Sequence, residues 1–345
     1  MKTKHTAILL GILLPLCLVS CEKMREKVSI TGVLIANTEV DDRIEMSYQF
    51  YKERMDATAF MFIEQDNYSF LVGADSHLTT DPGRLDEMFK IALDEDDLFV
   101  THLGDIADTK AEYYARLDSI VTAAKQRYVD QRYDRIDFYE YVPKGSTSHE
   151  ITTFQDIRFP FYPVVGNHDI TRNGWALWSN IFHSSFYEVD IVILGENQEV
   201  AAVDHLIFLD SASGTLGQKQ IELIEQGVLD GKYADGSSIY RNTFVFSHTN
   251  IFRPQFNEMA STFTREETFF LLDRFEKWNV TAVFCGHVHT WDERDYNGVH
   301  YLTLDTMCEA ERPEPGEYLV RIKVDPEGNV LWEPVKMNYV PKKKK

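Results

Sequence analysis

The sequence is poor in cysteine, in long apolar runs and in positive charge, and each shortage excludes a class of protein. Four cysteines among 345 residues do not indicate a disulfide framework. Beyond its first twenty residues the chain has no apolar run long enough to span a bilayer, which excludes a multi-span membrane protein. Lys and Arg number 35 against 55 Asp and Glu, a formal net charge of −20. Because this charge repels a polyanion, we expect no nucleic-acid partner.

The first twenty residues have the pattern of an export signal. Two lysines precede an uncharged run rich in Leu and Ile over 6–19, which is too short to cross a bilayer comfortably but suits the core of a signal peptide. The run ends in Leu-Val-Ser-Cys, which resembles the lipobox of bacterial lipoproteins. We therefore expect residues 1–20 to be a lipoprotein signal peptide and the exported chain to be anchored to the bacterial cell envelope, periplasmic or at the surface, by a lipid on Cys21. An ordinary secretory signal or an N-terminal anchor is the alternative.

The rest of the chain alternates between apolar runs and helix-like segments. The runs typical of strands covered on both faces are 68–73, 98–103, 161–165, 206–209, 243–246 and 281–285. The helix-like segments are 82–93, 112–128, 218–227 and 265–278. Strand-like segments at 300–304, 318–324 and 330–335 follow. This order predicts an α/β fold with a β-rich end, built as a layered sandwich.

Four regions follow from this pattern. After the signal peptide we expect an N-terminal extension, 21–58, that packs on the core and contains a helix-like stretch at 41–54. Residues 59–341 are predicted to form the main domain, and 342–345 a solvated basic tail.

Side chains that bind metals follow five of the apolar runs. The segments are 73–77 (Gly-Ala-Asp-Ser-His), 104–108 (Gly-Asp-Ile-Ala-Asp), 166–169 (Gly-Asn-His-Asp), 247–249 (Ser-His-Thr) and 286–289 (Gly-His-Val-His). Because α/β sheets bind ligands at the carboxyl ends of their strands, we expect the five segments to converge. Their carboxylates, imidazoles and amide suit divalent or trivalent first-row metals, and one carboxylate can bridge two ions.

In this order the five segments resemble the motifs of the calcineurin-like metallophosphoesterase family. The resemblance implies a four-layer αββα sandwich of two mixed sheets, with a two-metal site at the C-terminal ends of the strands. The implied ligands are Asp75, His77 and His289 for the first metal and Asn167, His248 and His287 for the second, with Asp105 bridging the two. His168 would stand near the leaving group, Asp169 would orient the His168 imidazole, and Asp108 would be a supporting residue.

The resemblance predicts a hydrolase for a small phosphate mono- or diester that works by in-line attack of a metal-bridging hydroxide. Two metals neutralise the phosphoryl oxygens and lower the pKa of bound water, and His168 would serve the leaving oxygen as acid or hydrogen-bond donor. The ligand set admits Mn, Fe or Zn. Monoesterase, diesterase and pyrophosphatase activities stay open, and the irregular stretches 127–158 and 249–265 are candidate specificity elements. We predict no protein partner.

Two alternatives come from other classes. A catalytically silent surface lipoprotein that uses the fold for binding predicts a broken ligand position, and none is broken. A covalent hydrolase would need a nucleophile, but the sequence has no Gly-x-Ser-x-Gly. Cys285 lies in an apolar run and Cys308 beside acidic residues, which disfavours a thiolate at either. His102, inside a strand-like run, is expected to be packed rather than to bind a metal.

Overall fold

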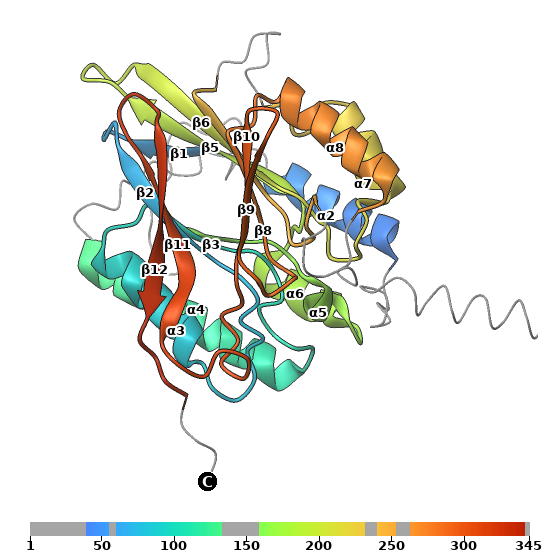
Figure 1. Cartoon of the computed structure of the whole chain (residues 1–345), viewed down its shortest axis with the longest axis vertical. Coiled ribbons are helices and arrows are strands. Elements are labelled where there is room, and N and C mark those ends of the chain that lie inside the picture. Colours follow the sequence, from blue (N-terminus) through green and yellow to red (C-terminus); the bar gives the residue numbers. More distant parts are fainter. Residues whose placement is uncertain (1–38, 55–59, 133–158, 232–239, 253–262, 342–345) are drawn as a thin grey trace, which may run out of the picture.

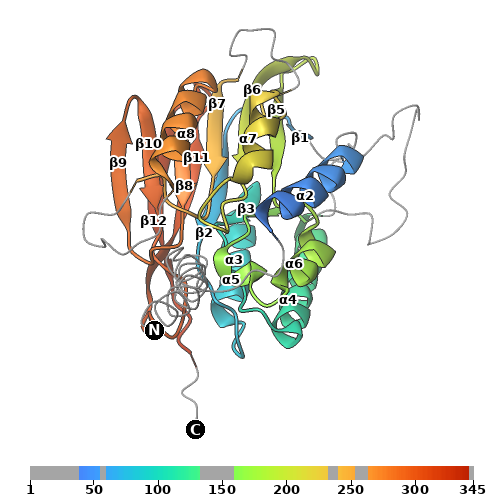
Figure 2. The same ribbon diagram turned by 90° about the vertical axis from the view of Figure 1, so that its right-hand side faces the viewer.

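The computed structural model describes residues 39–54, 60–132, 159–231, 240–252 and 263–341. Two mixed sheets pack face to face, and helices cover the outer face of each, so the predicted four-layer αββα sandwich is confirmed (Figure 1, Figure 2). The helices are α2 (Val40–Arg54), α3 (Gly83–Asp94), α4 (Ala111–Arg132), α5 (Asn167–Ile170), α6 (Gly174–Phe182), α7 (Gly217–Glu225) and α8 (Arg265–Lys277).

The larger sheet has the strand order β1-β5-β6-β7-β8-β10-β9. Its strands are β1 (Phe60–Ile63), β5 (Tyr187–Leu194), β6 (Val200–Phe208), β7 (Asn242–Phe246), β8 (Ala282–Cys285), β9 (Asp292–Tyr296) and β10 (Val299–Thr303). Strands β6, β7, β8 and β10 run parallel, and β9 closes one edge antiparallel to β10. The parallel centre places the ends of β7 and β8 at one rim of the sheet.

The smaller sheet has the order β12-β11-β2-β3-β4. Its strands are β2 (Tyr68–Gly73), β3 (Phe99–His102), β4 (Phe161–Pro163), β11 (Gly316–Val324) and β12 (Val330–Met337). Strands β2, β3 and β4 run parallel, while β11 and β12 form an antiparallel hairpin beside β2. The ends of β2, β3 and β4 therefore lie together at one rim.

Three apolar layers hold the sandwich together. The layer between the sheets is rich in aromatic rings, and Phe70 stacks on Phe99 at 4.4 Å between ring centroids and meets Phe244 edge-on. A second layer lies between the smaller sheet and α3, α4 and α6, and a third between the larger sheet and α2, α7 and α8. Each buried aromatic pair of this kind contributes about 0.5–1.5 kcal/mol to folding stability, in addition to the contribution from burying its apolar surface.

Helix α2 packs on α7 and carries a fully buried arginine. Arg43 Nε donates to Asp210 Oδ2 at 2.7 Å and Nη2 donates to Oδ1 at 2.9 Å. Ser185 Oγ donates to the same carboxylate at 2.6 Å. A buried arginine without a partner would destabilise the fold. Helix α2 therefore has to lie where Arg43 reaches Asp210.

Several predicted segments lie outside the described residues. They are the expected signal peptide 1–20, Cys21 with its expected lipid, the rest of the extension up to residue 38, 55–58, most of the 127–158 stretch, 253–262 and the tail 342–345. Among the described residues, no helix is both long and apolar enough to cross a membrane.

Candidate metal centre

Each of the five candidate metal-binding segments begins at the end of a strand or within three residues of it, and the fold brings them to one rim of the two sheets. Segments 73–77 and 104–108 follow β2 and β3, and 166–169 follows β4 as the start of α5. Segments 247–249 and 286–289 follow β7 and β8. The backbone turns sharply there: Asp75, His77, Asp105, His287 and His289 have left-handed φ angles of 52°, 43°, 53°, 74° and 54°.

The first group of donors consists of Asp75, His77 and His289, whose ligand atoms lie within 4.8 Å of one another. His77 Nε2 lies 3.2 Å from His289 Nε2, and His289 Nε2 lies 3.4 Å from Asp75 Oδ1. The other carboxylate oxygen of Asp75 accepts the His287 amide at 2.9 Å. Asp75 Oδ1 is thus left facing His289 Nε2, which in turn lies against His77 Nε2.

The second group consists of Asp105, His248 and His287, with Asn167 beside them. His248 Nε2 lies 3.2 Å from His287 Nδ1 and 2.9 Å from Asn167 Oδ1. The opposite nitrogen of His248, Nδ1, lies 2.7 Å from the Leu103 carbonyl oxygen, which fixes the ring so that Nε2 faces the group.

Asp105 lies between the two groups. Its Oδ1 accepts the His168 amide at 2.7 Å, which turns Oδ2 toward the donors. Asp105 Oδ2 is 3.8 Å from His77 Nε2 in the first group and 3.5 Å from His248 Nε2 in the second. One oxygen of Asp105 therefore lies near a donor of each group, as a carboxylate shared by two cations would have to.

Gly166 lies against Asp105, and its missing side chain lets the β4–α5 segment approach the Asp105 backbone closely. A Cβ on Gly166 would lie 2.1 Å from the Asp105 backbone nitrogen, so no larger residue fits there without a shift of the backbone. The glycine before the Asn-His-Asp segment is therefore a packing requirement of the site.

The donor set fits metal ions. Asp75 Oδ1 is buried and, although His289 Nε2 lies 3.4 Å away, it accepts no hydrogen bond of good geometry from the described residues. Two carboxylates, four imidazoles and an amide oxygen also match the preferences of Mn, Fe and Zn. Burial, together with the electrostatic effect of the neighbouring His248 ring, lowers the pKa of His287 to about 4, so the His287 ring is neutral at neutral pH.

His168 stands beside the first group, and its partner differs from the one expected. The predicted partner was Asp169, but His168 Nδ1 lies 3.0 Å from Asp108 Oδ1. The rings of His168 and His77 meet edge to face at 4.6 Å between centroids. His77 Nδ1 also lies 3.6 Å from Asp108 Oδ1, so one carboxylate faces both imidazoles.

Asp169 points away from the His168 imidazole, and the expectation that it orients this ring is wrong. Its carboxylate accepts the backbone amides of Gly166 at 2.9 Å, Ala107 at 3.1 Å and Ile106 at 3.3 Å. The physical reason is local: a carboxylate at the third position of a helix reaches back to the amide that precedes the helix. Asp169 thus stabilises the two loops that carry Asp105 and Asn167.

The charges of the carboxylates set the protonation of His168. Burial opposes the imidazolium form, but the hydrogen bond to Asp108 and the charge of Asp105 outweigh it and raise the pKa of His168 to about 9. The hydrogen bonds from His168 and His77 hold the pKa of Asp108 well below its usual value. The raised pKa favours the protonated form of the His168 ring at neutral pH.

Two residues that the sequence assigned to packing lie close to the centre but outside it. His102 is fully buried, and burial lowers its pKa to about 3, so the ring stays neutral. Cys285 is buried, and burial raises the pKa of its thiol to about 12. A thiol with this pKa is no nucleophile at neutral pH, which argues against a cysteine hydrolase at this position.

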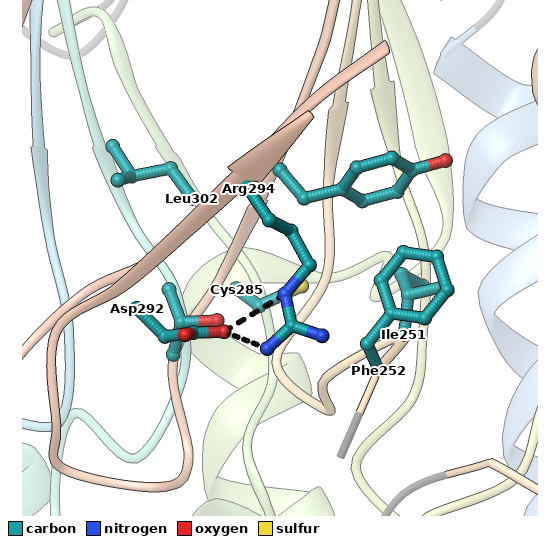
Figure 3. A pocket seen from close by; sticks show the side chains of 8 residues that line it. Ile251, Phe252, Cys285, Asp292, Arg294 and Leu302 are labelled. Atoms are coloured by element: carbon teal, nitrogen blue, oxygen red, sulfur yellow. Dashed lines mark hydrogen bonds and ion pairs between the residues drawn. The ribbon is translucent and has the colours of Figure 1, made fainter. Parts of the chain in front are cut away.

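A small pocket opens beyond the segment that follows β7 (Figure 3). Ile251 and Phe252 line it opposite Asp292 and Arg294 of β9, with Cys285 between them. Arg294 Nε donates to Asp292 at 3.1 Å, and its guanidinium lies 5.4 Å from the centre of the Phe252 ring. No residue that lines this pocket belongs to the groups of metal-binding side chains.

Three solved structures found by comparison share little sequence with this chain. GAP50, described as the anchor in the inner membrane complex of Plasmodium, is 10% identical, with a TM-score of 0.46 over 81% of this chain and 90% of that one. A dimetal phosphatase from Danio rerio is 12% identical, with a TM-score of 0.39 over 77% of this chain and 98% of that one. A putative 5′-nucleotidase from Staphylococcus aureus, in complex with α-ketoglutarate, is 13% identical, with a TM-score of 0.41 over 80% of this chain and 55% of that one.

No curated protein matches the sequence. The model of the calcineurin-like phosphoesterase family matches residues 68–291, which include all five metal-binding segments. On this match, which spans well over half of the sequence, the chain belongs to the calcineurin-like phosphoesterase family.

Proposed function

We propose that this protein is an exported, lipid-anchored enzyme that hydrolyses a small phosphate mono- or diester with two metal ions. The observation that carries the proposal is the pair of donor groups joined by Asp105 Oδ2, with the His168–Asp108 pair at their side. Family membership supports metal-dependent phosphoester hydrolysis in general. The predicted lipobox at Cys21 supports the anchor.

In this proposal Asp75, His77 and His289 hold one metal, and Asn167, His248 and His287 hold the other, with Asp105 shared. When bound, two such cations neutralise phosphoryl oxygens and lower the pKa of water enough to supply hydroxide near neutral pH.

Protein side chains would supply the proton and hold the metal-binding loops in place. His168 carries a proton toward the leaving oxygen, and Asp108 holds the imidazole in place from the opposite nitrogen. Asp169 keeps the amides of Gly166 and Ala107 fixed, so that the loops of both metal positions keep their spacing.

The test combines metal content with hydrolysis. The full chain, purified in detergent, is loaded with Mn, Fe or Zn, counted for metal by elemental analysis and assayed with a chromogenic monoester and a chromogenic diester. Asp105→Asn and His168→Ala are the site variants. Asp94→Asn is the matched control, since Asp94 lies exposed at the end of α3.

We expect close to two metals per chain, loss of activity in Asp105→Asn, and retained metal with reduced turnover in His168→Ala. The ratio of the two rates then assigns the protein as a phosphatase or a phosphodiesterase. A wild-type chain that takes up no metal and hydrolyses neither ester refutes the proposal and favours the binding lipoprotein.

A further inference from the structure

The connection between β10 and β11, residues 304–315, lies beyond the part of the chain that matches the family, yet it lies against the first group of donors. It leaves the larger sheet at the rim where the donors gather and enters the smaller sheet through β11. We refer to this segment as the crossover.

Two consecutive residues of the crossover hold one metal-binding histidine. Glu311 Oε2 lies 2.7 Å from His289 Nδ1. Arg312 Nη2 donates to the His289 backbone carbonyl at 3.1 Å. The ring and the backbone of His289 are thus both fixed by residues that the sequence motifs do not include.

The crossover also supports the other end of the first group. Thr306 Oγ1 donates to the Asp75 carbonyl oxygen at 2.7 Å, and the Met307 amide donates to the Ala74 carbonyl oxygen at 3.0 Å. These bonds fix the turn in which Asp75 has its left-handed backbone conformation.

The crossover is itself anchored. Arg84 of α3 is 1% exposed, and its guanidinium donates to the carbonyl oxygens of Met307 at 3.3 Å and Glu314 at 2.9 Å, and to that of Arg312. The Arg312 guanidinium forms an ion pair with Asp305 at 2.8 Å. The backbone of the segment is thus fixed on both sides of Glu311, whose 45% exposed side chain reaches the His289 ring.

We propose that Glu311 is a positioning residue for His289, and that through it the crossover sets the affinity of the first metal position. With Glu311 at Nδ1, the His289 ring presents Nε2 to Asp75 Oδ1 and His77 Nε2. A carboxylate behind a metal-binding imidazole fixes its tautomer and raises its basicity. This inference rests on the two-metal site of the proposed function.

The second metal position provides an internal comparison. There His248 Nδ1 faces the Leu103 carbonyl, and among the described residues no hydrogen bond or ion pair joins the crossover to His248 or Asn167. Loss of Glu311 should therefore weaken one metal position and leave the other unchanged. A general loss of structure would weaken both.

The experiment is a calorimetric titration of the metal-free full chain in detergent with Mn²⁺, and separately with Zn²⁺. Wild type is compared with Glu311→Ala and Glu311→Asp. Glu317→Ala is the matched control, since Glu317 is exposed on β11 beyond the crossover. Loss of a carboxylate behind a metal-binding histidine typically lowers metal affinity roughly 10–100-fold.

We expect two binding steps in wild type and in Glu317→Ala. In Glu311→Ala one step should weaken within that range while the other keeps its affinity, and Glu311→Asp should recover part of the loss. Unchanged affinity at both positions, or equal weakening of both, would overturn the inference. A wild-type chain that binds no metal would instead refute the proposed function on which it rests.

Discussion

Asp108→Asn keeps the size of the side chain and removes the charge that faces His168. The bond from His168 Nδ1 to Asp108 Oδ1 is 3.0 Å long, and the two side chains are 37% and 41% exposed. A hydrogen bond between charged groups contributes about 1.5–3 kcal/mol, and solvent screening favours the lower end of this range. About 1.5 kcal/mol corresponds to roughly a tenfold change in rate and to about one pKa unit.

The assay uses two monoesters that differ in their leaving groups. A nitrophenolate leaves without much help from an acid, whereas an alkoxide needs a proton. If Asp108 acts through His168, kcat of Asp108→Asn falls about tenfold for the alkyl ester and less for the nitrophenyl ester. The alkaline limb of the pH–rate profile for the alkyl ester should also move about one pH unit lower, because the His168 imidazolium loses the stabilising charge of Asp108.

His168→Ala provides the control. Adding Asp108→Asn to it should cause no further loss, because residues that act as one unit are not additive. An equal fall for both esters, or a further fall in the double variant, would show that Asp108 acts elsewhere, with its 3.6 Å contact to His77 as the first candidate. Elemental analysis of each variant separates that outcome from simple loss of metal.

Three other predictions concern stability. Asp169→Asn places an amide donor against buried backbone amides and should lower the free energy of unfolding by about 1–3 kcal/mol, seen as a lower urea midpoint. Arg43→Met leaves the Asp210 carboxylate buried without its partner and should lower the free energy of unfolding by about 3–5 kcal/mol. Adding Asp210→Leu should recover part of this loss. No recovery would mean that α2 is held by other contacts. His205, buried beside Asp190 at 2.6 Å, has a pKa above its usual value: burial opposes the charged ring, but the Asp190 bond outweighs it. The contribution of His205 to stability is complete below about pH 6.5 and is lost as the pH rises through its higher pKa in the folded state. The stability lost in His205→Gln should therefore be largest in acid and shrink in base. The opposite trend in thermal melts would contradict this assignment.

Much of the metal centre could be predicted from the sequence because its residues follow buried strands immediately. Apolar runs such as 68–73 and 243–246 are dense enough in β-branched and aromatic residues to be recognised, and they coincide with β2 and β7 to within a residue. Within each sheet the polar residues after the runs then have to meet at one rim, because β2, β3 and β4 run parallel, as do β7 and β8.

Other elements gave no such signal. Strand β5 was not predicted, because Glu188 and Asp190 interrupt its apolar residues; both are buried and face His205, which comes later in the chain. Edge strand β9, Asp292–Tyr296, is almost wholly polar and cannot be told from a loop by its pattern. Strand β6 begins at Val200, well before the run at 206–209 that predicted it.

Side-chain partners were harder to predict than positions. Asp169 follows His168 directly in the sequence, which suggested a contact, but the first turn of α5 directs its carboxylate to backbone amides. Asp108 and Glu311 reach their histidines from other segments of the chain, and nothing in the spacing of the motifs indicates which carboxylate faces which ring.

The left-handed backbone of the metal-binding residues has a consequence for how such a site persists through evolution. A non-glycine residue in this conformation is disfavoured by on the order of 1 kcal/mol, and Asp75, His77, Asp105, His287 and His289 all adopt it. Substitution of any of them by glycine would relieve that strain while removing a ligand. Selection for stability alone would therefore favour glycine at these positions, so the five donors carry a cost in stability that a benefit from binding has to offset.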